Sequence, residues 1–199
     1  DNTSSIAMSG SDPSGNSAAT EEWTGAGAPI GAWSTGGNLN TARQTLGGAG
    51  ASSTAALAFG GGPPGVAITE LYDGSSWTEV NDLNTGRAFL GGTGTQTAAL
   101  AFGGEGPPIS TATEVWNGTN WATSPGTLNT ARNLMAESGT STSALAFGGE
   151  GPPNLAVTES WNGTSWTEVN DLNTARRNFS GSGASNTEGL AIGGYITAN

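Results

Sequence analysis

Nearly the same six-residue sequence occurs four times in the chain. Ala-Leu-Ala-Phe-Gly-Gly occurs at 56–61, 99–104 and 144–149, and a looser copy, Gly-Leu-Ala-Ile-Gly-Gly, lies at 189–194. One arginine accompanies each copy, with spacings of 44, 45 and 44 residues along the series Arg43, Arg87, Arg132 and Arg176. A period of this length indicates a repeat architecture, in which each copy is one unit that buries its apolar face against its neighbours.

Aromatic residues follow the same period. One series of tryptophans has spacings of 44, 44 and 45 residues: Trp33, Trp77, Trp121 and Trp166. A second aromatic series precedes it and keeps the register except at its first step: Trp23, Tyr72, Trp116 and Trp161. Extra residues between Trp23 and Trp33 cause that exception, and an insertion that leaves the rest of the register intact must lie in a loop.

Composition favours strands and turns. The 199 residues include 34 glycines, and the apolar residues come in short runs bounded by Gly, Pro and Asn. No stretch shows helical periodicity, and the longest apolar runs are far too short to span a bilayer. The length suits one sizeable domain with a core. No signal peptide is visible, and a start at Asp1 fits a processed or trimmed chain.

Charge restricts the partners. Sixteen acidic residues face five arginines, with no lysine and no histidine, for a net charge of −11. Such a surface repels phosphate backbones, so we expect no nucleic-acid partner, and no insertion into a membrane. The chain has no cysteine, which excludes disulfides and thiolate metal sites, and the lack of histidine removes the commonest transition-metal ligand. We therefore assign no metal-binding residues and expect no cofactor.

Each repeat can be divided into four strands. In the copy around residue 100, the pattern predicts strands at 87–93, 97–102 and 112–116, with a fourth that begins at Trp121. Asn117-Gly118 predicts a tight type I′ turn, in which both central residues have positive φ. Four short antiparallel strands in about 45 residues are typical of a propeller blade. The expected fold is an all-β propeller.

The pattern resembles the kelch motif of β-propellers. Its elements are a strand that ends in Gly-Gly, an aromatic, a tryptophan and an arginine, here Gly103-Gly104, Trp116, Trp121 and Arg132. The resemblance covers almost the whole chain, but the aromatic and the tryptophan are five residues apart, where kelch repeats generally space them wider. The Gly- and Thr-rich phrasing is also similar to kelch-like repeats in predicted proteins of marine bacteriophages.

The two ends of the chain lie inside repeats. We expect a single domain over 1–199, with partial blades at 1–38 and 172–199 and full repeats at 39–82, 83–127 and 128–171. Residues 5–10 match a second strand, so pairing of the C-terminal first strand with the N-terminal strands would close four blades and remove exposed edges. One second strand is then surplus. It is displaced, or pairs with a neighbouring chain, or the ring has more blades than one chain provides.

The recurring arginines and glutamates predict ion pairs rather than a site. Each repeat holds one arginine and one glutamate of a Thr-Glu pair, and an arginine fork can hold a carboxylate together with neighbouring carbonyls. A binding or catalytic site usually breaks the symmetry of a repeat, and these residues keep it. The glutamates are Glu70, Glu114 and Glu159, with Glu21 or Glu22 in the first copy.

Tryptophans and loops supply the candidate ligand contacts. Indole rings can stack on sugars, but repeat-invariant positions such as Trp77, Trp121 and Trp166 favour a place between blades. Trp23 and Trp33 flank the unique insertion and remain candidates for glycan binding. Glu105 and Glu150 belong to Gly-Pro-Pro loops that could bind a ligand, a partner chain or calcium, or could simply be stiff turns.

Two functions remain open. The first is a non-catalytic module on a virion or an extracellular surface, which recognises glycans, copies of itself or other surface proteins. The second is a carbohydrate-active propeller enzyme that uses a pair of carboxylates. Galactose-oxidase-like propellers need Cys, Tyr and His around copper, and this chain lacks Cys and His. We therefore expect no catalytic residues. An open β-solenoid is the alternative fold, although solenoid rungs would be shorter.

Overall fold

The protein is an all-β, propeller-like molecule. The computed structural model describes residues 4–13, 15–25 and 32–196. These residues form 17 strands in five antiparallel sheets and contain no helix. Accordingly, the described part of the chain offers no helix with the length and apolar character to cross a membrane.

Three full sheets of four strands form the middle of the molecule, one in each full repeat. The first contains β4 (Gly47–Ser52), β5 (Ala55–Phe59), β6 (Thr69–Tyr72) and β7 (Trp77–Glu79). The second contains β8 (Gly91–Thr95), β9 (Ala98–Phe102), β10 (Thr113–Trp116) and β11 (Trp121–Thr123). The third contains β12 (Ala136–Gly139), β13 (Ala144–Phe147), β14 (Thr158–Trp161) and β15 (Trp166–Val169).

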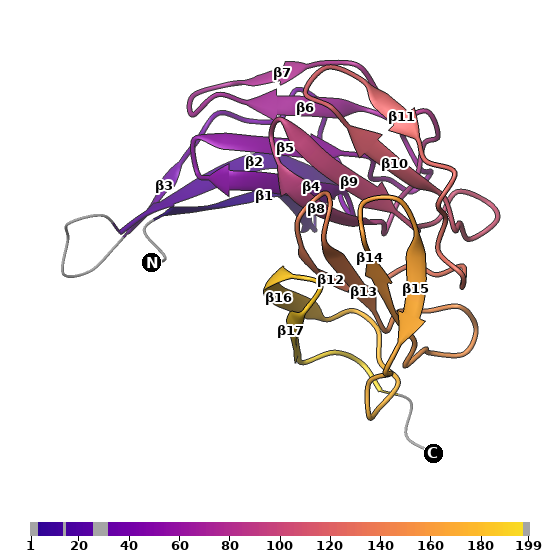
Figure 1. Ribbon diagram of the computed structural model, residues 1–199. Coiled ribbons are helices and arrows are strands. Elements are labelled where there is room, and N and C mark those ends of the chain that lie inside the picture. The colour runs from indigo at the N-terminus through magenta and orange to yellow at the C-terminus, as the bar shows by residue number, and fades with distance from the viewer. Residues whose placement is uncertain (1–3, 14, 26–31, 197–199) are drawn as a thin grey trace.

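The ends of the chain form two smaller sheets. The N-terminal sheet has three strands, β1 (Ser4–Asp12), β2 (Gly15–Thr24) and β3 (Ala32–Thr35). The C-terminal hairpin has two, β16 (Ser180–Ser185) and β17 (Glu188–Ile192). Figure 1 shows the five sheets in a curved row, in the order of the sequence. Neighbouring full sheets meet along their first strands, β4 with β8 and β8 with β12, and β12 meets β16 in the same way.

A chain of backbone hydrogen bonds joins the segments that precede these first strands. The amide of Phe89 donates to Thr45 O, that of Leu134 to Phe89 O, and that of Asn178 to Leu134 O, at 2.8, 3.2 and 3.1 Å. All four residues have positive φ, between 52° and 57°, which is uncommon for residues other than glycine. This local geometry moves the start of the first strand. In the second full sheet it begins at Gly91, not at the predicted Arg87.

The Asn-Gly turns differ from the predicted type I′ turn. Gly118 has a φ of 92°, but Asn117 is not among the residues with positive φ. Instead, Asn117 Oδ1 accepts the amides of Thr119 and Asn120 at 3.0 and 2.8 Å. The loop therefore has four residues, and an asparagine side chain that bonds to the following backbone replaces the second left-handed residue.

The predicted pairing of the two chain ends is absent from the described residues. β16 pairs with β17, and β1 pairs with β2, so the end strands belong to two separate sheets. The reason lies in the surplus second strand. β1 and β17 are both second strands, and Ser9-Gly10 after Met8 repeats the positive φ values of Gly60-Gly61 after Phe59. β17 therefore occupies the edge of β16 that β1 would need.

Candidate functional site

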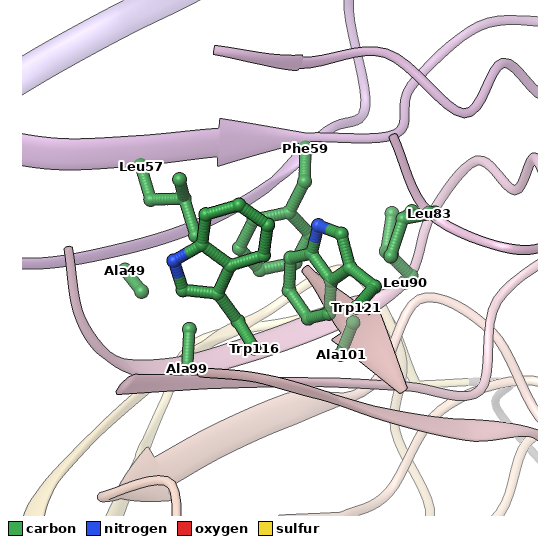
Figure 2. Packing of buried hydrophobic residues seen from close by; sticks show 9 residues of the cluster. All are labelled: Ala49, Leu57, Phe59, Leu83, Leu90, Ala99, Ala101, Trp116 and Trp121. Atoms are coloured by element: carbon green, nitrogen blue, oxygen red, sulfur yellow. The ribbon is translucent and has the colours of Figure 1, made fainter. Parts of the chain in front are cut away.

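The faces between neighbouring sheets are built from one alternating strand. In β5 the side chains of Leu57 and Phe59 point forward, that is, toward the next sheet in the sequence. They pack on Trp116 and Trp121 of the second full sheet. Figure 2 shows both indoles between the two sheets, with Ala49, Leu83, Leu90, Ala99 and Ala101 around them. Alternation in a strand sends successive side chains to opposite faces. Each full sheet therefore has a forward face of large aliphatic or phenyl groups, directed toward the next sheet in the sequence, and a backward face of alanines and two aromatic rings, directed toward the preceding sheet.

The same interface recurs between the other sheets. Phe59 meets Trp121 with ring centroids 4.9 Å apart, and Phe102 meets Trp166 at 4.8 Å. At the first interface Ile6 and Met8 of β1 take the places of Leu57 and Phe59, and pack against the cluster around Trp77. The repeat-invariant tryptophans Trp77, Trp121 and Trp166 are thus buried between sheets.

A hydrogen bond fixes each of these tryptophans. Trp121 Nε1 donates to Thr69 Oγ1 at 3.0 Å, and Trp166 Nε1 donates to Thr113 Oγ1 at the same distance. Trp77 Nε1 donates to Thr20 Oγ1, also at 3.0 Å. This contact identifies Thr20 as the repeat threonine of the first copy, so Glu21 is the equivalent of Glu70, and Glu22 is not.

The predicted arginine–glutamate pairs are present in all three full sheets. Arg87 Nη2 lies 2.9 Å from Glu114 Oε1, Arg132 Nη2 lies 2.9 Å from Glu159 Oε1, and Arg43 pairs with Glu70. Arg87 Nη1 also donates to Gly103 O and Ala112 O, at 2.9 and 2.8 Å. Burial lowers the pKa of the Arg87 guanidinium, and the carboxylate of Glu114 acts in the opposite direction.

An asparagine completes this buried polar group, and sequence reasoning missed it. The backbone amide of Asn84 donates to Glu114 Oε2 at 2.7 Å, and its side-chain amide donates to the same oxygen at 2.9 Å. The side chain also donates to Trp121 O at 3.1 Å. The residue is the Asn of Leu-Asn-Thr-Ala/Gly-Arg, so its once-per-repeat spacing carried the signal. These groups hold strands together within one sheet and leave no open site.

The loop glutamates contact the following repeat. Asn133 Nδ2 donates to Glu105 Oε2 at 3.1 Å, and Arg177 pairs with Glu150. The Arg177 and Glu150 side chains are about one third exposed, at 29% and 30%. Both glutamates thus connect successive repeats, and the geometry does not gather them into one ligand site.

Trp23 and Trp33 lie on the backward face of the N-terminal sheet. They are directly opposite each other on β2 and β3, with ring centroids 5.8 Å apart and planes inclined by 56°. Their positions match those of Trp116 and Trp121, but Trp33 is 50% exposed where Trp121 is 6% exposed. The pair therefore has the arrangement of the aromatic half of an interface between sheets, with Trp33 left exposed.

A cavity of about 300 Å³ lies among the first strands β4, β8, β12 and β16. Its wall is mostly glycine, and Glu137 is the acidic residue among its lining residues. Burial raises the pKa of Glu137 to about 8, while the Gly92 amide acts in the opposite direction. Glu137 was missed from the sequence, although it replaces the glycine that other repeats carry as Gly48, Gly92 and Gly181.

A single carboxyl group does not make the pair that glycoside hydrolysis uses. Within the described ranges, no three or more acidic side chains are grouped so that they could hold a metal ion. The chain matches no protein-family model, and it is similar to none of the curated proteins with which it was compared.

Proposed function

We propose that this chain is a non-catalytic structural module, a kelch-type propeller displayed on a virion or another extracellular surface, that assembles with copies of itself. The observation that carries the proposal is the place of its exposed apolar side chains. Within residues 4–13, 15–25 and 32–196, six large hydrophobic residues are exposed, and five of them belong to the two end repeats: Trp33, Leu190, Ile192, Tyr195 and Ile196. Exposed apolar side chains that gather in particular regions, rather than being scattered singly, are typical of interaction sites.

The polar residues of the repeats support a structural role. Arg43, Arg87 and Arg132 are at most 2% exposed, and each is bound to a carboxylate of its own sheet. The loop glutamates Glu105 and Glu150 bind the next repeat. Most of the recurring chemistry thus stabilises the row of sheets. The acidic, lysine-free composition supports display on an outer surface, as does the resemblance of the Gly- and Thr-rich repeats to those of bacteriophage proteins.

Glycan recognition is a second candidate for the same N-terminal face. The inclined pair of half-buried Trp23 and exposed Trp33 offers indole surface on which a sugar ring can stack. A glycan and a second copy of the chain would compete for this surface, so the two candidates can be separated by experiment.

The test is the mass of the native particle, measured by light scattering after size exclusion, followed by binding to a glycan array. We expect particles of two or more chains of 19.6 kDa each. Binding to a defined set of glycans by a particle of single-chain mass would favour the second candidate. A particle of single-chain mass that binds neither glycans nor surface preparations would contradict the proposal.

A further inference from the structure

The two end repeats carry opposite halves of one interface. Inside the chain, each interface onto a full sheet joins a forward face of two large side chains to a backward face of small residues and two aromatic rings. The N-terminal sheet uses its forward face, Ile6 and Met8, against the first full sheet. The C-terminal hairpin uses its backward face, where Gly189 lies against Leu145 of the third full sheet.

The forward face of the C-terminal hairpin is open. Leu190 and Ile192 of β17 are 59% and 50% exposed, whereas the equivalent Leu100 and Phe102 of β9 are fully buried. Burial of an aliphatic side chain is favourable, so two such groups in water are a marked departure from the other repeats.

The backward face of the N-terminal sheet is open in the same way. Ala7 is exposed, while its equivalent Ala58 is fully buried under the preceding sheet. Trp33 and Trp23 stand beside it, where Trp121 and Trp116 stand in the second full sheet. This face therefore offers the alanine and the two rings on which large side chains like those of Leu190 and Ile192 pack at the other interfaces.

We propose that the forward face of β17 in one copy docks on the backward face of the N-terminal sheet in a second copy. Ile192 then lies against Trp33, as Phe59 lies against Trp121, and Leu190 lies against Trp23, as Leu57 lies against Trp116. The proposal rests on the self-assembly proposed above and names its surfaces. The occupant is a second copy because the chain itself makes this interface repeatedly with the same residue types.

Docking of faces requires no strand to be displaced. A four-stranded sheet like those of the full repeats, with β16 of one copy and β2 and β3 of another around a single second strand, would require β16 to give up β17 or β2 to give up β1, because both second strands are already paired. Two different faces that meet head to tail form a heterologous contact, which closes into a ring or continues as a filament.

The experiment compares three serine variants of the 199-residue chain by sedimentation velocity over a concentration series. Ile192→Ser and Trp33→Ser each remove one face, and we expect each to weaken association by about 30-fold or more. Val169→Ser is the matched control, because Val169 is exposed on β15 and lies on neither end face. It should associate as the native chain does. Circular dichroism checks that all variants keep the fold.

Mixing provides a second, independent readout. Ile192→Ser keeps an intact N-terminal face and Trp33→Ser keeps an intact C-terminal face, so an equimolar mixture should form pairs that stop at two chains. If the native chain associates but both variants associate equally well, the docking surfaces are wrong while self-assembly stands. In a sheet shared between copies, Arg176 of one copy would pair with Glu21 of the other, as Arg43 pairs with Glu70. If association is lost in Arg176→Met and retained in Ile192→Ser, copies share a sheet instead. A native chain that stays monomeric overturns both proposals.

Discussion

Trp121 donates its indole N–H to the hydroxyl of Thr69 across the boundary between two sheets, at 3.0 Å. Trp121 is 6% exposed and Thr69 is fully buried, so the bond forms where water does not compete. Phe59 packs on the same indole. A polar contact and an aromatic contact thus fix one ring between two repeats, and the arrangement recurs at Trp166.

Replacement of Thr69 by valine should destabilise the protein by about 1–3 kcal/mol, because the buried N–H of Trp121 loses its acceptor while the shape is retained. The measurement is the free energy of unfolding in urea. Thr69→Ser is the control, since it keeps the hydroxyl and removes one methyl group, at a cost of about 0.8 kcal/mol. Equal costs for the two variants would show that the bond does not contribute.

Removal of Arg87 should lower the free energy of unfolding by more than replacement of Thr69 does. Arg87→Met leaves the buried carboxylate of Glu114 without its cation, and loss of one partner of such a pair costs about 3–5 kcal/mol. The double variant Arg87→Met/Glu114→Gln removes the stranded charge and should be no less stable than the single variant. Arg176→Met should cost about 1 kcal/mol or less, because this partly exposed arginine donates to Gly193 O and pairs with no carboxylate among the described residues. Additive costs in the double variant would contradict this account.

Local sequence patterns predict the repeats well because their causes are local. The Ala-Leu-Ala-Phe alternation and the Arg and Glu of each repeat predict strands and ion pairs, since strand periodicity and charge pairing act within one repeat. The pairing of the chain ends was predicted wrongly for a non-local reason. β1 and β17 compete for one edge of β16, and the outcome depends on the whole of each hairpin.

The candidate site was harder to predict than the fold. Trp23 and Trp33 were identified because they flank the insertion, but their opposition across β2 and β3 emerges only from the register of the strands. Glu137 was overlooked because nothing distinguishes it from the other fifteen acidic residues until the repeats are aligned residue by residue. Only that alignment shows that it replaces a glycine. The positive φ of Phe89 and Leu134 has no sequence signature, since neither residue type favours that conformation.

Close approach of the first strands gives a prediction with opposite signs at two equivalent glycines. A Cβ at Gly92 would lie 2.6 Å from Phe59 Cζ and 2.9 Å from the backbone of Gly48, so Gly92→Ala should cost about 1–3 kcal/mol. A Cβ at Gly48 would meet nothing closer than 3.8 Å. Gly48→Ala should therefore stabilise by about 0.4–1 kcal/mol through the unfolded state. Thermal unfolding of the two variants checks both signs, and equal shifts would contradict the close approach.

The carboxyl of Glu137 should make stability depend on pH. Its pKa is raised from 4.5 to about 8 by burial, so between these values the folded state holds a proton that the unfolded state releases. The free energy of unfolding should then fall as the pH rises from about 5 to about 8, and level off above that range. Glu137→Gln should remove this fall and be more stable than the native chain at pH 8. Glu79→Gln removes one charge at an exposed position of β7 and should keep the fall. If both variants lose it, the dependence comes from net charge and not from the Glu137 carboxyl.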